Sequence, residues 1–107
     1  MAFWTYILAS RRNGTLYTGC TDDLIWRVTQ HKEHQLPGFT DRYGVTRLVW
    51  YEEHDSREEA FLRERRIKRW RRAWKIALIE TGNPGWRDLF DDLQEPVLSP
   101  DSPLRET

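Results

Sequence analysis

The sequence has little sulfur and no long apolar run. Of its 107 residues one is cysteine, Cys20, and one is methionine. A single cysteine excludes an intramolecular disulfide and a cysteine-based metal cluster. No stretch of 18 or more apolar residues occurs, so we expect no membrane span. The first six residues lack the features of a signal peptide. A cytoplasmic chain with no obligate protein partner is the simplest interpretation.

The chain has no net charge, but its charged residues are unevenly distributed. Seventeen basic and seventeen acidic side chains cancel over the whole sequence. Residues 57–75 hold nine Lys or Arg and three Glu, a local net charge of +6, whereas residues 88–107 have a local net charge of −5. Such a basic segment favours a polyanionic partner. The alternative is a solvated, salt-bridged helix next to an acidic tail.

Residue types predict alternating strands and helices. β-Branched and aromatic residues predict strands at 3–10, 15–20 and 46–53. Capping residues and apolar periodicity predict helices at 24–32, 57–69 and 73–81. The expected fold is therefore α+β, a small, mainly antiparallel sheet flanked by helices.

The remaining segments are expected to be loops, a short turn and a tail. Residues 33–44 are polar around Pro37-Gly38 and predict a loop. Residues 86–93 are expected to form a short last turn that packs Trp86, Leu89 and Phe90. Residues 94–107 carry prolines and acids and predict a flexible tail, which leaves one domain of residues 1–93.

Two tyrosines lie in the first predicted hairpin. Asn13-Gly14 is a strong turn signal and permits either a two-residue turn or a four-residue loop that pairs Tyr6 with Gly19. Both registers place Tyr6, Tyr17 and Gly19 on one face, because strand side chains alternate. Gly19 leaves room there for a ring or a phosphate. Two ordinary half-buried tyrosines are the alternative interpretation.

Arg27 and His31 lie on the apolar stripe of the first predicted helix. His31 follows Leu24 and Val28 at helical spacing, with Arg27 beside them. A guanidinium at such a position stabilises charge on a phosphate, and an imidazole moves a proton. A surface arginine and a partly buried histidine are the alternatives.

Glu64 lies on the side of the second predicted helix that carries Ala60, Phe61 and Ile67. A carboxylate there needs a partner, and we expect Arg27 or a divalent metal. One carboxylate suits a single Mg²⁺, which keeps several waters. We expect Glu64 to face the tyrosines, beside Arg27, in an open groove. A structural ion pair with another arginine is the alternative.

Basic residues of the third helix and of the loops predict a nucleic-acid surface. The candidate phosphate contacts are Arg11, Arg12, Lys32, Arg42, Lys68, Arg71 and Arg72. Such side chains bind phosphates without reading sequence. We expect Trp70 and Trp74 to pack in the core, and Cys20 to be a small, half-buried strand residue.

Together these segments resemble the GIY-YIG nuclease family over residues 3–93. Trp4-Thr5-Tyr6 stands where the family has GIY, and Tyr17-Thr18-Gly19 where it has YIG. Residues 23–32 resemble the following helix, and Glu64 matches the family's metal-binding glutamate. The stretches 38–40, 43–45, 70–75 and 83–89 look like the small stand-alone bacterial YhbQ-like, or UPF0213, proteins. Several segments matched in order are more specific than either short motif.

The resemblance implies a three-stranded sheet flanked by helices and metal-dependent hydrolysis of a nucleic-acid phosphodiester, with DNA as the favoured substrate. By position, Tyr6 or Tyr17 would take a proton from the attacking water. Arg27 would stabilise the transition state, and His31 would assist by proton transfer or phosphate binding. Glu64 would hold one Mg²⁺ or Mn²⁺.

The resemblance has departures and leaves two alternatives open. Trp4, Thr5 and Thr18 replace family residues at packing positions. Asn83 is a weaker match, to an asparagine that some relatives use near the site. One alternative is a non-catalytic nucleic-acid-binding module with a degenerate site. The other is an RNA-directed nuclease, because no 2′-hydroxyl reader is recognisable.

Overall fold

Three strands form one antiparallel sheet in a computed structural model of the protein, which describes residues 2–35 and 38–94. β1 spans Phe3–Ala9, β2 Leu16–Thr21 and β3 Arg47–His54, in the order β2-β1-β3. Each strand begins and ends within one residue of its predicted bounds. The predicted sheet is confirmed.

The β1–β2 hairpin adopts the four-residue-loop register. Tyr6 is paired with Gly19 and Leu8 with Tyr17. Ser10 N donates to Thr15 O at 3.0 Å, and the loop between them contains Asn13 with a φ of 58°. Asparagine tolerates this left-handed conformation better than most residues. Tyr6 and Tyr17 therefore share one face of the sheet, as the alternation predicted.

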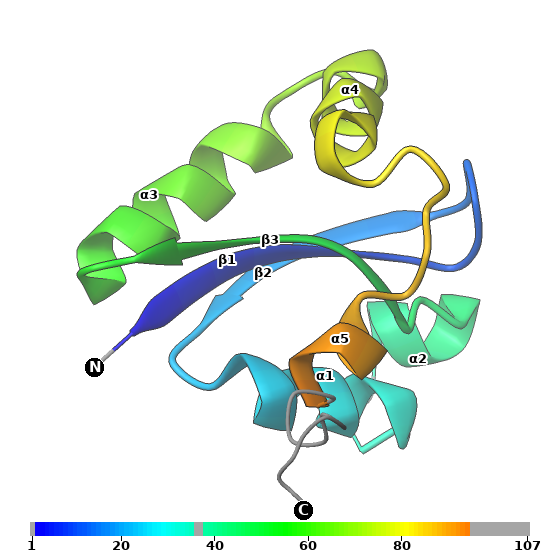
Figure 1. The fold of residues 1–107 in the computed structure, drawn as a ribbon, viewed down its shortest axis with the longest axis horizontal. Helices are drawn as coiled ribbons and strands as arrows, with labels where there is room; N and C mark the ends of the chain where they lie inside the picture. The colour runs from blue at the N-terminus through cyan, green and yellow to red at the C-terminus, as the bar shows by residue number, and fades with distance from the viewer. Residues whose placement is uncertain (1, 36–37, 95–107) are drawn as a thin grey trace, which may run out of the picture.

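Helices cover both faces of the sheet (Figure 1). α1 (Leu24–Lys32), α2 (Phe39–Tyr43) and α5 (Phe90–Gln94) lie on one face, and α3 (Arg57–Lys68) and α4 (Arg72–Gly82) on the other. The predicted caps are present: Asp23 accepts from Trp26 N, and Ser56 from Glu59 N. None of the described helices has both the length and the apolar character needed to span a membrane.

A short helix interrupts the segment that was predicted to be a loop. α2 is five residues long and ends at Gly44, which adopts a φ of 64°. The next amide, Val45 N, donates to Thr40 O at 2.9 Å, and both residues are buried. Burial of its inner side, rather than helix propensity, accounts for this turn.

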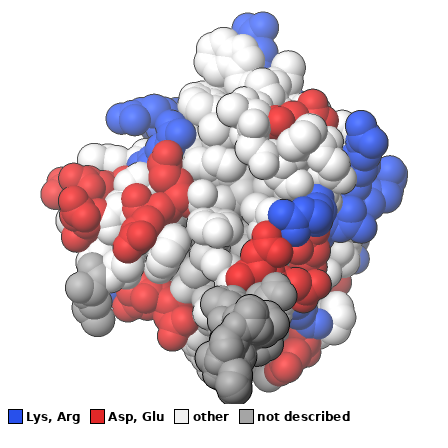
Figure 2. All heavy atoms as spheres, in the orientation of Figure 1, with Lys and Arg blue, Asp and Glu red and all other residues white. Residues whose placement is uncertain are grey.

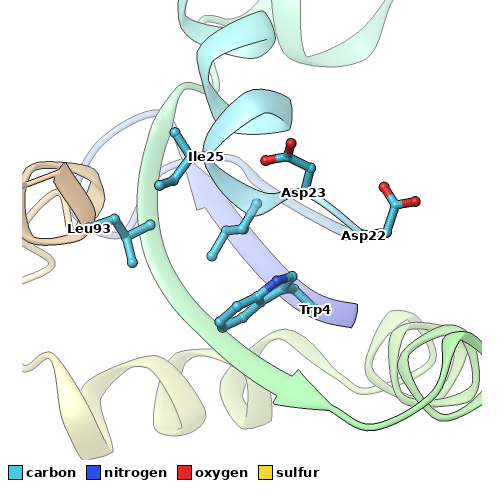
Figure 3. Close-up of a pocket in the computed structure, with 6 residues that line it drawn as sticks. Trp4, Asp22, Asp23, Ile25 and Leu93 are labelled. Atoms are coloured by element: carbon cyan, nitrogen blue, oxygen red, sulfur yellow. The ribbon is translucent and has the colours of Figure 1, made fainter. Parts of the chain in front are cut away.

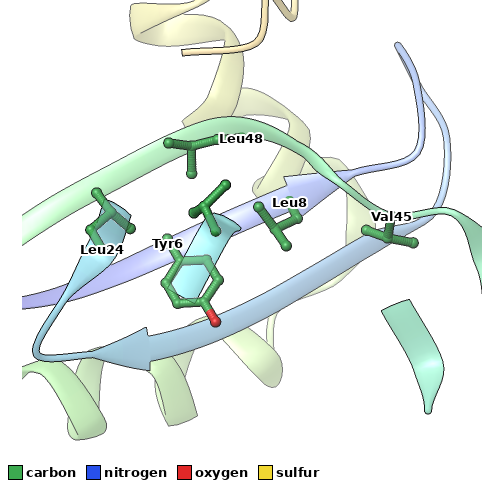
Figure 4. Close-up of a cluster of buried hydrophobic side chains, with 6 residues drawn as sticks. Tyr6, Leu8, Leu24, Val45 and Leu48 are labelled. Carbon is green, nitrogen blue, oxygen red and sulfur yellow. The ribbon is translucent and has the colours of Figure 1, made fainter. Parts of the chain in front are cut away.

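The sheet has a hydrophobic core on each face. The core on the α1 side contains Tyr6, Leu8, Leu24, Val28, Val45 and Leu48 (Figure 4). The core on the α3 side contains Ile7, Ala9, Val49, Ile67, Ile79 and Trp86. Successive residues of β1 alternate between the two cores. In Figure 4 the Tyr6 ring extends from β1 toward β2, so a phenol lies at the border of the first core.

The predicted short last turn is present as α5, and Trp86, Leu89 and Phe90 all pack, but against opposite faces of the sheet. Trp86 lies in the core on the α3 side, whereas Leu89 and Phe90 pack on the α1 side. The chain crosses the border of β3 between them, and Trp86 adopts a φ of 56° at the start of this crossing. The predicted tail, apart from Gln94, which ends α5, lies outside the described residues.

Residues 83–89 cover the free edge of β3. Asn83 Nδ2 donates to Val49 O at 3.2 Å, and Leu89 N donates to Leu48 O at 2.8 Å. Asp88 Oδ1 accepts from Leu48 N at 3.2 Å. These bonds satisfy backbone groups that an edge strand otherwise exposes.

Candidate functional site

Tyr6 and Gly19 fit together at the centre of the hairpin. Tyr6 is almost fully buried, with its ring over Gly19 of the neighbouring strand. A Cβ at residue 19 would lie 2.6 Å from Tyr6 Oη and 3.1 Å from Cε2 of Tyr17. A glycine is therefore required here to bring the two phenols against the backbone.

His31 links the Tyr6 hydroxyl to α2. Its Nε2 lies 3.3 Å from Tyr6 Oη, and its Nδ1 lies 2.9 Å from Thr40 Oγ1. Burial, followed by the charge of Arg27, lowers the pKa of His31 to about 4. The imidazole is therefore neutral at pH 7 and connects two hydroxyl groups.

Tyr17 is the more accessible of the two tyrosines. It is half-buried, and its ring centroid lies 5.5 Å from that of His31 and 6.4 Å from that of Tyr6. Burial, with a further contribution from Tyr17, raises the pKa of Tyr6 well above its usual range. Tyr6 therefore keeps its proton, whereas Tyr17 is open to a substrate.

Arg27 brings an unsatisfied donor to this group. Its Nε is buried and has no hydrogen-bond partner among the described residues. Its positive charge lowers the pKa of His31 and counteracts the rise at Tyr6, so the guanidinium lies near both. A buried donor without an acceptor is rare, and an anion at this position would satisfy it. The sequence prediction that Arg27, His31 and both tyrosines come together agrees with this geometry.

Glu64 does not pair with Arg27 as expected. Its carboxylate contacts Lys68 Nζ at 2.5 Å, one helical turn along α3, and its side chain is 13% exposed. α3 packs on the face opposite Tyr6, where Thr5 Oγ1 donates to Ala60 O at 2.9 Å. Glu64 therefore approaches the tyrosines around the edge of β2, not across the face that carries α1.

Lys68 connects Glu64 to the tyrosines at this edge. Its Nζ lies 5.8 Å from the Tyr17 ring centroid, and the Glu64 carboxylate raises its pKa. Cys20, on β2, is half-buried as predicted, and burial followed by a hydrogen bond to Glu64 raises its pKa to about 11. Tyr17, Cys20, Glu64 and Lys68 therefore form one group along the β2 edge.

The Glu64 carboxylate borders an open hollow of about 310 Å³, whose other lining residues are Phe61, Arg65, Lys68 and Arg69. No three His, Cys, Asp or Glu side chains gather as ligands within residues 2–35 and 38–94. One carboxylate fits a hard ion such as Mg²⁺, which takes its remaining ligands from water and substrate. An ion here would have to displace the Lys68 ammonium.

Two side chains of the predicted α3–α4 surface are more exposed than expected. Phe61, predicted on the apolar side of α3, is largely exposed, and Trp74, predicted in the core, is 53% exposed. Trp74 instead packs edge-on against the half-buried Trp70, with ring centroids 6.1 Å apart and an interplanar angle of 78°. Helical spacing alone did not identify the buried side, because α3 meets the sheet along a narrow strip that contains Ala60 and Ile67.

Arg72 joins the hairpin loop to the first turn of α4. Its guanidinium donates to Asn13 O at 2.8 Å and to Gly14 O at 2.6 Å. The exposed Arg11 and Arg12 of the same loop therefore lie beside α4. Figure 2 shows Lys and Arg side chains gathered at the border where Figure 1 places the hairpin tip.

Further cations lie close to this loop. Burial, followed by the charges of Arg72 and Lys68, lowers the pKa of Lys75, so these three side chains are neighbours. Arg71 is exposed beside the Trp74 ring. Most of the predicted phosphate contacts thus gather on the side of the molecule next to Tyr17.

Two predicted site residues have structural partners elsewhere. Lys32 Nζ donates to Asp88 Oδ2 at 2.5 Å and to Thr46 O at 3.0 Å, at the β3 border. Asn83 is buried, and its amide bonds to Val49 O and to the backbone of Arg87. Both side chains hold the segment that covers β3, away from the tyrosines.

A second hollow, of about 210 Å³, lies at the start of α1 (Figure 3). Trp4, Leu24, Ile25 and Leu93 line it together with two aspartates. Asp23 caps α1, and Asp22 pairs with the Arg57 guanidinium at 3.3 Å. Its carboxylates therefore have structural partners, and the hollow is separate from the tyrosines.

The geometry agrees with comparisons to known proteins. The family model of the GIY-YIG catalytic domain matches residues 2–77. The chain belongs to the GIY-YIG family. This is a family of nucleases, and membership implies a nucleic acid as the class of substrate. The family resemblance found in the sequence is confirmed.

Several UPF0213 proteins are similar to this chain. The chain is 35% identical over 71 residues to UPF0213 protein SSP2268 of Staphylococcus saprophyticus. The matched stretch covers 66% of this chain and 87% of that protein. The chain is also 35% identical over 68 residues to UPF0213 protein SAV0488 of Staphylococcus aureus, covering 64% and 83%. The solution NMR structure of UPF0213 protein BH0048 from Bacillus halodurans is similar with a TM-score of 0.52 and 28% identity, covering 85% of this chain and 96% of that one.

Thr40 and the pairing of Lys68 with Glu64 were not predicted from the sequence of this GIY-YIG site. Thr40, which holds Nδ1 of His31, lies in a segment predicted to be a loop. Lys68 was assigned to phosphate binding, although its spacing of four from Glu64 is a standard signal for a helical ion pair. No pattern in the sequence pointed to Thr40.

Proposed function

We propose that the protein is a divalent-metal-dependent endonuclease that hydrolyses phosphodiester bonds of DNA. The observation that carries this proposal is the buried Arg27 Nε without a partner, next to a phenol–imidazole pair and close to the β2 edge. A phosphate oxygen is an acceptor that suits a guanidinium. Family membership supports the same chemistry.

Tyr17 is the group that takes the proton of the attacking water. It is half-buried and faces Lys68, whereas Tyr6 is buried and engaged with His31. After the Tyr17 hydroxyl gives its own proton to solvent, its oxygen takes the proton of the water while the water oxygen bonds to phosphorus and the bond to the leaving oxygen breaks. The leaving oxygen takes a proton from solvent. The Lys68 ammonium stabilises negative charge on Tyr17.

Arg27 stabilises the negative charge that develops on the phosphate oxygens. Its Nε then gains the acceptor that it lacks in the free protein. Neutral His31 holds Tyr6 and Thr40 in place rather than carrying charge, because its pKa is about 4. Arg27 thus stabilises charge, and His31 positions the neighbouring hydroxyl groups.

Glu64 is the residue that would hold one Mg²⁺ or Mn²⁺. When bound, such an ion supplies Lewis-acid stabilisation of the phosphate and of the leaving oxygen. Lys68, which pairs with Glu64 in the free protein, would be released from the carboxylate when Glu64 holds an ion and would then be available to contact a substrate phosphate. The cations of the hairpin loop and α4, namely Arg11, Arg12, Arg71 and Arg72, bind the nucleic-acid backbone next to the site.

The test is cleavage of a panel of branched, flapped, single-stranded and duplex DNA with Mg²⁺ or Mn²⁺. Tyr17→Phe and Glu64→Gln should each lower the rate about 100-fold or more. Tyr51→Phe, which alters a half-buried phenol packed against Trp4, serves as the matched control and should leave the rate unchanged. Cleavage by Glu64→Gln at the wild-type rate would remove the metal assignment.

A second function is tested in the same experiment. Binding of DNA without cleavage in every metal and substrate would favour a non-catalytic binding module. Matched RNA substrates test the third possibility, because the proposed chemistry acts on the phosphate alone. Faster cleavage of RNA than of DNA would contradict the choice of DNA.

A further inference from the structure

Two aromatic rings of α2 are exposed next to the candidate site. Phe39 is 48% exposed and Tyr43 is 50% exposed. The Phe39 ring centroid lies 6.5 Å from that of Tyr17 at an interplanar angle of 29°, and 4.9 Å from that of Tyr43. The three rings form a row that begins at the proposed general base and ends in solvent.

The helix that carries these rings is fixed on its inner side. Thr40 is buried and bonds to His31 Nδ1, and Val45, just after the helix, is fully buried in the core. Asp41 contacts His34 Nδ1 at 2.8 Å. The rings of Phe39 and Tyr43 are therefore held outward by an anchored helix, at low cost in side-chain ordering on binding.

Cations flank both ends of the row. The Arg42 guanidinium lies 5.5 Å from the Tyr43 ring centroid, and Lys68 Nζ lies 5.8 Å from that of Tyr17. Exposed aromatic rings between basic side chains are what a nucleic-acid strand requires, since bases stack on rings and phosphates pair with cations. The positive charge and the continuity with the phosphate site favour this occupant over an apolar protein surface.

We propose that Phe39 and Tyr43 form a stacking shelf for an unpaired base next to the phosphate that is cut. This inference rests on the proposed function and specifies its substrate. A base inside a duplex has both faces covered by its neighbours, so it stacks on a side chain only after leaving the helix. The preferred substrates are then strands with an unpaired nucleotide at the cut, as in flaps, bubbles and single strands.

The test measures binding without cleavage, in EDTA, with the wild-type protein and 2-aminopurine-labelled DNA. The double variant Phe39→Ala/Tyr43→Ala should weaken binding of a single-stranded oligonucleotide about tenfold or more and abolish the change in 2-aminopurine emission. Its affinity for a fully paired duplex should change less than twofold. Phe39→Trp should restore most of the single-strand affinity, because it retains a stacking ring.

The matched control is Trp26→Ala, which removes a ring of α1 that is 54% exposed and lies outside the row. It should leave single-strand binding unchanged. Equal losses for single-stranded and duplex DNA in the double variant, or no loss for either, would overturn the shelf. Far-ultraviolet circular dichroism and a thermal melt of each variant separate these results from misfolding.

Failure of the shelf is distinguishable from failure of the nuclease proposal. Base stacking by a protein that cuts nothing would support the shelf and contradict the endonuclease. Cleavage by the double variant with the wild-type preference among flapped, single-stranded and paired substrates would contradict the shelf and support the endonuclease.

Discussion

The two faces of the sheet are both packed, but their polar groups differ. On the α3 side, the core is apolar, and the polar atoms beside it are paired: Trp86 Nε1 donates to Glu80 at 2.6 Å, and the Asn83 amide bonds to backbone groups. On the α1 side, a phenol and an imidazole lie in the core, and the Arg27 Nε has no partner among the described residues.

The different pairing of polar groups on the two faces indicates which face contributes mainly to stability and which contributes to function. Paired polar groups and apolar packing contribute to folding, whereas a buried donor without an acceptor costs free energy until a ligand arrives. We therefore expect substitutions in the apolar core on the α3 side to change stability, and substitutions of Arg27 or the tyrosines on the α1 side to change chemistry. Glu64, which lies on α3 at the β2 edge, belongs with the site and not with that core. Four experiments test this separation, from the largest expected effect to the smallest.

Ile79→Ala should lower the free energy of unfolding by about 2–5 kcal/mol. Ile79 is fully buried in the core on the α3 side, and the truncation leaves a cavity. Urea titration measures the loss. The rate of cleavage at a temperature where the variant stays folded should equal that of the wild type, and a large drop there would contradict the separation of the two faces.

Arg27→Met should lower the cleavage rate about 100- to 1000-fold, the usual effect of removing a donor to a developing negative charge. Stability should stay constant or rise by about 1 kcal/mol, because a buried unsatisfied donor is removed. Rate measurements and urea titration of the same protein check both effects. A strong loss of stability would show that Arg27 has a structural role.

Stability should fall as the pH drops from 7 toward 4, because His31 is buried in its neutral form. Its pKa is about 4 in the folded protein and about 6.5 in an unfolded chain, so in this window only the unfolded chain takes up the proton. The contribution at pH 5 is a loss of about 2 kcal/mol.

The measurement for His31 is the free energy of unfolding at pH 7.5 and pH 5, in the wild type and in His31→Gln. The difference between the two pH values should be smaller in the variant. The matched substitution His34→Gln alters an exposed histidine and should keep the wild-type pH dependence. An unchanged pH dependence in His31→Gln would refute the assignment.

Asp23→Ala and Ser56→Ala should each lower stability by about 1 kcal/mol. They remove the side-chain caps of α1 and α3, one on each face. Similar losses would show that the two helices begin in the same way and that the faces differ in their side chains alone. A much larger loss for one variant would indicate that its helix start carries tertiary contacts.

Much of this architecture was predictable because local signals agree with the fold. β-Branched and aromatic residues marked β1 and β2, and Asp23 and Ser56 marked the starts of α1 and α3. Because strand side chains alternate, either hairpin register places Tyr6 and Tyr17 on one face of the sheet. Helical spacing places His31 on the apolar stripe of α1.

The rest depended on contacts between distant segments. α2 is one short helical turn, and the partners that hold it, such as His31, come from elsewhere in the chain. Trp86 stays in the core on the α3 side, and its positive φ, which no residue type announces, marks the point after which the chain crosses to the α1 side. The partner of Glu64 is the local residue Lys68, one helical turn away, rather than the distant Arg27 that was predicted.

The segment that covers β3 has a consequence for the protein at high concentration. A three-stranded sheet has two outer strands, and an uncovered one is a template for aggregation. The bonds from Leu89 N to Leu48 O and from Leu48 N to Asp88 remove that template along part of β3. The chain thereby protects this edge from strand addition with its own backbone and with the Asp88 carboxylate, which occupies the Leu48 amide that a further strand would need.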